Sequence, residues 1–324
     1  QSLVCELTGM DVANAGMYDG ASAMAEACLM ACSVTGRDRI LLLDSVHPHV
    51  VDTVRTYADG RDFEVNVVSA ADVALSDQDA CLAVQQPGFF GYLEDLAALS
   101  NAAHEAGALF VVSADPVSLG LYKPPSAYDA DIVVGDGQPL GVPLSFGGPY
   151  VGLFACRSEY VRHMPGRVAG RTKDLDGRTG YVLTLQTREQ HIRRERATSN
   201  ICTSTQLVAL AFTVALCTLG KQGLRRMAEL CYHKAHYAAG EIAKLAGYEL
   251  ASPSTGSGQG FFQEFVVRCP APPAEVNRRL LERGIIGGYD VSDRIDRGLL
   301  LCFSELHTKA EIDALVEALG SVNG

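Results

Sequence analysis

Apolar and polar positions alternate between two patterns along the first 155 residues. Short apolar runs typical of buried strands occupy residues 39–44, 65–68, 79–85, 108–113, 131–134 and 150–155. Segments of helix-forming composition lie between several of them, at residues 23–34, 50–58 and 94–106. Alternating strands and helices with short linkers are typical of a parallel sheet covered by helices on both faces. We therefore predict an α/β fold with a mostly parallel sheet.

The pattern changes beyond residue 206, where long helices come before short strands. A buried helix is expected over residues 207–220 and a second long helix over 224–245. Strands at 261–268 and 299–303 and helices at 274–283 and 309–319 follow a Ser/Gly-rich stretch, 252–260, which predicts a flexible loop. We expect a large α/β domain over residues 1–222 and a small C-terminal α+β domain over residues 223–324.

Composition and charge exclude several classes of protein. The chain has 324 residues, of which 48% are hydrophobic, and a net charge of −11, which argues against nucleic acid as a partner. The apolar stretch 207–220 is shorter than the roughly 20 residues that a membrane span needs. Ten cysteines are dispersed without a Cys-x-x-Cys pair, a pattern that favours reduced, buried thiols in a cytoplasmic protein. Since Gln1–Met10 has the pattern of the middle of a helix, we also expect the chain to be a fragment or to begin after a missing segment.

Polar side chains follow the predicted strands where each strand ends. They are His47, Gln86, Asp115 and the loop residue Gln138. Ligands of open α/β sheets bind beyond the carboxyl ends of the strands, so these positions predict a site. Asp19, Gly20 and Ser22 begin a helix and offer amides and a hydroxyl to an anion such as phosphate. Taken alone, an ordinary helix N-cap is the simpler interpretation of that start.

No metal site is predicted. Cys28 and Cys32 lie four residues apart on a predicted helix, but no further ligand is near in sequence, so a core role is favoured. His47 and His49 lack a third ligand. The pair His233 and His236 is expected on the surface of a long helix.

Two further stretches suggest contact with another molecule. Glycine and proline crowd residues 135–149, which favours a backbone shaped around a ligand or another chain, or else a tight crossover loop. Residues 157–205 resemble an extended arm with a polar helix and carry nine arginines: Arg157, Arg162, Arg167, Arg171, Arg178, Arg188, Arg193, Arg194 and Arg196. This segment is interpreted as a site for an anionic partner or a neighbouring subunit, or as a solvated surface.

Six long motifs lie at Tyr18–Ser22, Gln85–Gly91, Ala114–Gly120, Gly135–Pro149, Leu185–Arg194 and Ala197–Thr203. They resemble motifs of the glycine cleavage system P-protein family. The resemblance is strongest to the alpha subunit of the two-subunit bacterial form. The resemblance covers essentially the whole chain, but the family's N-terminal region of roughly a hundred residues is missing, as expected for a fragment. It implies the type I fold of pyridoxal-phosphate enzymes, in agreement with the large and small domains predicted above.

The resemblance also assigns expected positions around a cofactor. Asp19, Gly20 and Ser22 match the phosphate position, His47 matches the residue against the cofactor ring, and Asp115 matches the acid that pairs with the pyridine nitrogen. Gly137 and Gln138 fall where catalytic chains of the family carry His-Lys. A Schiff base needs a primary amine, which glutamine lacks. We therefore expect no covalent cofactor on this chain.

The resemblance implies that pyridoxal phosphate is held by a partner, subunit 2. The Gly/Pro-rich loop and the arginine segment suggest a large partner surface, and we expect a heterotetramer with two copies of each subunit. The complex would decarboxylate glycine and pass the aminomethyl group to the lipoyl arm of the H-protein. Arg193 and Arg194 are the predicted partner contacts. Two alternatives remain: a scaffold without a role for its pocket, and a self-sufficient pyridoxal-phosphate enzyme. No membrane or nucleic-acid partner is expected.

Overall fold

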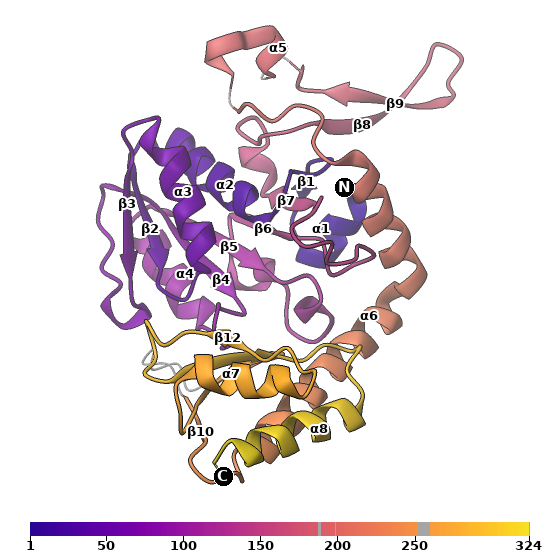
Figure 1. Ribbon diagram of the computed structural model, residues 1–324. Helices are drawn as coiled ribbons and strands as arrows, with labels where there is room; N and C mark the ends of the chain where they lie inside the picture. The colour runs from indigo at the N-terminus through magenta and orange to yellow at the C-terminus, as the bar shows by residue number, and fades with distance from the viewer. Residues whose placement is uncertain (187–188, 198, 252–259, 324) are drawn as a thin grey trace. The chain divides into compact units, whose positions relative to one another are not determined.

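The computed structural model describes residues 1–186, 189–197, 199–251 and 260–323. The chain forms two compact units (Figure 1): Gln1–Gln86 with Asp95–Leu224, and Pro87–Glu94 with Arg225–Gly324. The chain therefore leaves the first unit twice, the first time only for the short segment Pro87–Glu94. The sequence placed a single domain boundary between residues 222 and 223 and gave no indication that this short segment packs with the C-terminal unit.

The first unit is built on a seven-stranded sheet with the order β1-β7-β6-β5-β4-β2-β3. The strands are β1 (Val12–Ala13), β2 (Arg39–Leu43), β3 (Glu64–Val68), β4 (Asp79–Gln86), β5 (Leu109–Ala114), β6 (Ile132–Asp136) and β7 (Gly152–Cys156). Five neighbouring strands, β3, β2, β4, β5 and β6, are parallel, which confirms the predicted sheet. At the other edge β7 pairs antiparallel with both β6 and β1, a pairing that local pattern does not specify.

Helices α1 (Ser2–Thr8), α2 (Gly20–Thr35), α3 (Pro48–Asp59) and α4 (Leu96–Glu105) belong to this unit. Helix α2 packs against β4–β7 and against α3, and Ala23–Cys32 is buried throughout. Four of the buried residues are alanines, at positions 23, 25, 27 and 31. Cys28 and Cys32 lie in that core, as predicted. The expectation that the cysteines are buried is wrong for three of them, since Cys202, Cys217 and Cys302 are exposed.

The long helix α6 (Gln206–Ile242) differs from its prediction. Its first half was expected to be buried, but Leu207, Leu210 and Val214 are 81%, 57% and 56% exposed. These residues are three and four apart and so share one face, while Phe212 and Leu216 on the same half are buried. The prediction failed because an apolar composition shows that a helix has apolar faces, but not which of them this chain covers.

By length and composition α6 is also the one described helix that could cross a membrane. The backbone at Gly220 is not helical, with φ 59° and ψ −176°, so two helical segments meet there. The segment after Gly220 contributes Ala235, Ala238 and Ile242 to the core of the second unit. The apolar side chains of α6 are concentrated before Gly220, where Leu207, Leu210 and Val214 are exposed.

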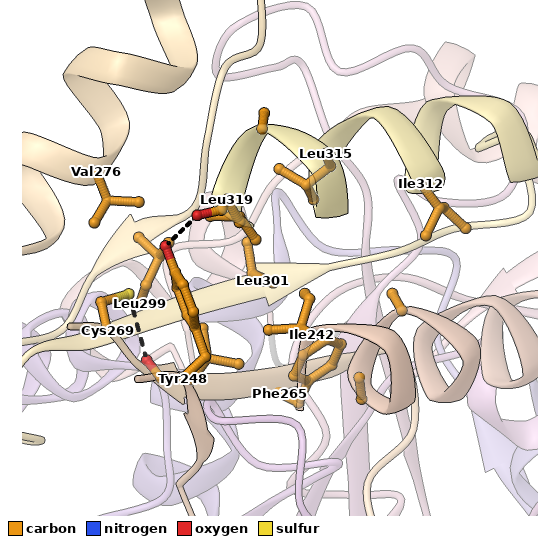
Figure 2. Packing of buried hydrophobic residues seen from close by; sticks show 14 of the residues in the cluster. Ile242, Tyr248, Phe265, Cys269, Val276, Leu299, Leu301, Ile312, Leu315 and Leu319 are labelled. Carbon is orange, nitrogen blue, oxygen red and sulfur yellow. Dashed lines mark hydrogen bonds between the residues drawn. The ribbon is translucent and has the colours of Figure 1, made fainter. Parts of the chain in front are cut away.

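The second unit has a four-stranded antiparallel sheet in the order β10-β11-β13-β12, as expected of an α+β lobe. Its strands are β10 (Glu249–Leu250), β11 (Glu264–Arg268), β12 (Tyr289–Asp290) and β13 (Gly298–Cys302), and its helices after α6 are α7 (Pro273–Glu282) and α8 (Lys309–Gly320). Figure 2 shows Phe265, Leu299 and Leu301 packed against the helices, where the Tyr248 hydroxyl donates to the Leu319 carbonyl. The alternate residues Val266 and Leu300 belong to a second cluster, as the two-residue period of a strand requires.

Pro87–Glu94 contributes Phe89 to that second cluster. Gly91 has a φ of +85°, and a Cβ atom there would collide with the carbonyl oxygen of Glu264. The amide of Phe262 donates to the Gly91 carbonyl, and the Tyr92 hydroxyl donates to the Ala251 carbonyl. The glycine therefore permits the close backbone approach that seats this segment on its unit.

The arginine-rich segment forms a hairpin of β8 (Val168–Lys173) and β9 (Thr179–Thr184), followed by the short helix α5 (Gln190–Arg193). The extended arm of the prediction is thus this two-stranded hairpin. Arg157 pairs with the buried Asp131 and donates to backbone carbonyls, so it is part of the fold. Arg188 and almost all of the predicted loop 252–260 lie outside the described residues.

A buried ion pair ties two strands of the large sheet together. Arg39 donates to both carboxylate oxygens of Asp79 at 2.5 and 2.7 Å, and the Ser76 amide donates to the same carboxylate. The Asp79 side chain is fully buried. Burial acts to raise the pKa of Asp79, but the bonds from Arg39 and Ser76 outweigh it and hold that pKa below its ordinary value.

We predict that Asp79→Ala lowers the free energy of unfolding by about 3 kcal/mol, because it leaves the partners of a buried carboxylate unpaired. A carboxyl group whose pKa is lowered by folding stabilises the fold above its unfolded pKa and loses this effect as the pH falls. The difference from the wild type should therefore shrink in acid. Urea denaturation followed by circular dichroism measures it. Asp176→Ala, in an exposed pair of the same unit, is the control and should cause no measurable change.

Candidate functional site

The carboxyl edge of the large sheet gathers the polar residues that the strand ends predicted. His47 follows β2, Gln86 ends β4, Asp115 follows β5 and Gln138 follows β6, and these four strands are parallel. Neighbouring strand ends are joined there by two hydrogen bonds: the His47 amide donates to Gln85 Oε1 at 2.9 Å, and the Asp115 amide to the Gln86 carbonyl at 3.1 Å. The edge is therefore a connected polar surface.

His47 is the N-cap of α3. Its Nδ1 accepts a hydrogen bond from the His49 amide at 3.1 Å, and the two imidazole rings lie 5.0 Å apart with a tilt of 53°. The neighbouring Pro48 occupies the first turn of the helix, where a missing N–H is tolerated. This capping contact fixes the lone pair of His47 Nδ1 toward the backbone. Within the described part of the chain, no group of three His, Cys, Asp or Glu side chains is arranged to hold a metal ion.

Asp115 lies half-buried directly after β5. Its Oδ1 accepts the Val117 amide at 2.9 Å, and the Ser118 hydroxyl donates to its carbonyl at 2.7 Å. Burial raises the pKa of Asp115 to about 6, and the backbone amides of Val117 and Ser118, which bond to the carboxylate, only partly oppose this effect. The carboxyl group is therefore held in a place that disfavours its charge, and a cation beside it would restore an ordinary pKa.

Helix α2 begins at this edge with its first amides bonded to carboxylates of the chain. Asp19 is the N-cap, and its Oδ1 accepts the Ser22 amide at 2.8 Å, while the Ser22 hydroxyl accepts the Asp19 amide, completing a capping box. The Gly20 amide donates to Oδ2 of Asp136 at 2.9 Å. At Asp19, Gly20 and Ser22, where a phosphate position was expected, the structure contains an ordinary helix N-cap.

Asp136, at the end of β6, was not singled out by the sequence. Its Oδ1 accepts the Gln138 amide at 2.9 Å while its Oδ2 accepts Gly20. Burial raises the pKa of Asp136, the neighbouring Asp19 raises it further, and the two amides oppose this. One sequence feature could have indicated Asp136: it is an acid at the end of a buried strand, two residues before the expected reactive position.

Gln138 folds back onto its own loop. Its Nε2 donates to the Val142 carbonyl at 2.7 Å, and the preceding Gly137 amide donates to the Val151 carbonyl at 2.7 Å. The chain has six lysines, at 123, 173, 221, 234, 244 and 309, and none of them belongs to this loop or to a strand of the large sheet. No lysine from these strand ends supplies an amine.

Pyridoxal phosphate therefore does not fit this edge as a covalently held group. Covalent attachment needs a primary amine, and the position where the resemblance leads us to expect one holds Gln138. The Gly20 and Ser22 amides of α2, expected to bind phosphate, are already bonded to Asp136 and Asp19. His47 and Asp115 lie at the same edge of the sheet, and their roles beside a cofactor ring stay predictions.

The predicted partner residues Arg193 and Arg194 lie elsewhere, at the end of α5 and in the turn after it, and both are exposed. Another motif from the sequence analysis contacts helix α2: the Ser199 hydroxyl donates to Glu26 at 2.7 Å. Burial raises the pKa of Glu26, although the bond from Ser199 opposes this. The sequence did not indicate this contact.

Comparison with solved structures supports the type I fold of pyridoxal-phosphate enzymes. An inhibitor-bound glycine decarboxylase (P-protein) of the glycine cleavage system superposes with a TM-score of 0.93 and 42% identity, over 99% of this chain and 74% of that one. A sphingosine-1-phosphate lyase from Burkholderia pseudomallei superposes with a TM-score of 0.70 at 17% identity, over 99% of this chain and 75% of that one, which shows the fold alone.

Curated relatives agree over nearly the whole chain. A probable glycine dehydrogenase (decarboxylating) subunit 1 of Thermomicrobium roseum is 53% identical over 98% of this chain and 73% of its own length. One of Geobacillus kaustophilus, with the same name, is 49% identical over 99% of this chain and 73% of its own length. The sequence profile of the glycine cleavage system P-protein matches residues 1–319. With the same fold and a match of this extent, the chain belongs to the glycine cleavage system P-protein family.

Proposed function

We propose that the chain is the first subunit of a two-subunit glycine dehydrogenase (decarboxylating) and that it supports a second subunit that holds pyridoxal phosphate. The observation that carries this proposal is Gln138. Relatives about half identical over nearly the whole chain are named subunit 1, which supports a second subunit, and Gln138 stands where the resemblance places a Schiff-base lysine. The cofactor of the complex then belongs to the partner.

Within that complex, glycine is the substrate and the lipoyl group of the H-protein is the acceptor. Glycine loses its carboxylate as CO₂, and the aminomethyl group that remains is transferred to a sulfur of the lipoyl disulfide, whose S–S bond is reduced. Bound pyridoxal phosphate supplies the electron sink for such chemistry. We assign no chemical step to a residue of this chain.

Exposed apolar side chains support a partner surface on the first unit. Leu207, Leu210 and Val214 form the uncovered face of α6. The Gly/Pro-rich loop packs against the same helix, since a Cβ at Gly141 would lie 2.6 Å from that of Ala215. This loop exposes Leu144 and Phe146, and strand β9 exposes Tyr181, Val182 and Leu183. Apolar side chains gathered on one unit in this number are typical of an interface.

The two alternatives differ from this proposal in what the pocket does. A self-sufficient pyridoxal-phosphate enzyme would need an amine at the sheet edge, which the chain does not supply there. A scaffold without a pocket role shares the partner surface and differs only in whether the edge residues matter to the complex. We place the complex in the cytoplasm, because its named relatives are bacterial metabolic enzymes and all ten cysteines are free thiols.

We predict that Leu210→Asp weakens assembly with subunit 2 at least tenfold, since a charge on a buried apolar interface is left without a partner. Light scattering of the co-purified pair, expected to contain two copies of each subunit, measures assembly. Leu281→Asp is the matched control, because Leu281 is similarly exposed but lies on α7. If the two subunits stay separate and monodisperse at micromolar concentration in the wild type, the complex itself is wrong.

The arginines give a second prediction. Replacing Arg193 and Arg194 together by glutamate should weaken complex formation or raise the H-protein concentration needed for half-maximal glycine decarboxylation, because charge reversal repels an acidic partner. The effect should shrink at high salt, which screens exposed charges. Arg178→Glu, in the exposed turn between β8 and β9, is the control. An unchanged complex and an unchanged H-protein requirement would leave a solvated surface as the explanation.

A third prediction concerns covalent attachment. Incubation of the isolated chain with pyridoxal phosphate, followed by borohydride reduction and peptide mapping, should label exposed lysines in scattered, substoichiometric amounts. Subunit 2 treated in the same way should carry one stoichiometric adduct. A single fully labelled lysine on this chain, together with glycine turnover in the absence of subunit 2, would establish the self-sufficient enzyme in its place.

A further inference from the structure

The contact between α2 and the end of β6 has the geometry of an anion site with an anion already in it. Helix N-termini at the carboxyl edge of an open sheet bind phosphate through their free amides. Here the Gly20 amide donates to Asp136 Oδ2 at 2.9 Å and the Ser22 amide to Asp19 Oδ1 at 2.8 Å. Two of the three leading amides of α2 are thus bonded to carboxylates of the same chain.

The approach also leaves little room for a second anion. A Cβ atom built on Gly20 would lie 2.9 Å from the Cβ of Asp136 and 3.1 Å from its amide nitrogen. The first turn of α2 therefore packs directly against the strand end. A phosphate oxygen accepting from Gly20 would have to displace the Asp136 carboxylate from the place that it occupies.

The charges at this helix start also disfavour phosphate binding. Asp19 and Asp136 are near enough for Asp19 to influence the titration of Asp136. Both carboxylates lie against the positive end of the α2 dipole and neutralise it. An entering phosphate would meet two negative charges and few unbonded amides, so its binding would be unfavourable even without the question of an amine.

We propose that Asp136 is a built-in substitute for the cofactor phosphate, which closes the N-terminus of α2 to phosphate ligands and holds the loop after β6 against α2. The second of these roles follows from its Oδ1, which accepts the Gln138 amide at 2.9 Å. The inference rests on the proposed function in one respect: the anion replaced by Asp136 is taken to be the phosphate of pyridoxal phosphate. Two features of this edge then exclude a covalently held cofactor: the missing amine at Gln138 and the carboxylate of Asp136.

Two variants of the full-length chain separate the missing amine from the carboxylate of Asp136. Gln138→Lys restores an amine and leaves the carboxylate, and the double variant Asp136→Ser with Gln138→Lys also frees the Gly20 amide and adds a hydroxyl donor. We expect the double variant to bind pyridoxal phosphate at least tenfold more tightly than Gln138→Lys alone, by spectroscopic titration, with a borohydride-stable adduct at position 138. Asp176→Ser with Gln138→Lys, which removes an exposed acid instead, should behave as Gln138→Lys.

Inorganic phosphate gives a second measurement that needs no amine. Calorimetry should detect binding to Asp136→Ser and none to the wild type at the same millimolar concentrations. In NMR spectra, the Gly20 amide should shift as Asp136 titrates in the wild type and stay unshifted over the same pH range in Asp136→Asn. This isosteric variant tests the contact if Asp136→Ser fails to fold, which circular dichroism would reveal.

Equal affinity of Gln138→Lys and the double variant for pyridoxal phosphate would overturn the inference, as would phosphate binding to the wild type or a Gly20 amide that ignores the state of Asp136. The first two results would mean that Asp136 is an ordinary cap that a ligand displaces. None of them bears on assembly with subunit 2 or on glycine turnover by the complex. Failure of the inference and failure of the proposed function are therefore distinguishable.

Discussion

The distance between the first turn of α2 and the end of β6 controls the chemistry of the sheet edge. Gly20 allows the helix to approach within hydrogen-bonding distance of Asp136, because any side chain at that position would meet the strand end. Behind it, α2 is buried from Ala23 to Cys32 and packs against strands β4 to β7. A helix held this close turns its N-terminal amides toward the strand ends, and those amides require acceptors.

Local pattern was sufficient for the elements whose burial is decided within a few residues. β2, β4, β5 and β6 are continuous apolar runs because both of their faces are covered, and the structure has them within a residue or two of the prediction. Elements defined by their partners were missed. β1 and β10 are only two residues long and exist through pairing with β7 and β11, which no short window of sequence encodes.

The uncovered face of α6 also shows that local sequence does not encode what an element packs against. A run of leucine, valine and phenylalanine predicts burial, but the molecule that covers it need not be the same chain. Seating of Pro87–Glu94 on the second unit also depends on a distant partner, the strand that contains Glu264. The spacing and composition of apolar residues predict which surface of an element is apolar. They do not predict which segment or molecule covers that surface.

For the site, strand ends predicted which positions would meet, and the structure brings His47, Gln86, Asp115 and Gln138 to one edge. The contact that decides the character of that edge was invisible in the sequence because Gly20 and Asp136 are 116 residues apart. It has a physical origin that is independent of any ligand. The first amides of a helix have no acceptor within the helix, and leaving such amides unbonded in a partly buried place costs stability.

In an enzyme of this fold, a bound phosphate satisfies such amides, so the cofactor is part of the structure as well as of the chemistry. A chain that gives up the amine gives up the covalent hold on that phosphate, and the helix start would then lose its acceptor. A carboxylate on the adjoining strand removes the deficit within the chain itself, at the modest cost of holding a buried acid against a neighbouring one. If the proposed function holds, Asp136 takes the place of that phosphate as the acceptor for the Gly20 amide, so the helix start stays bonded without a ligand.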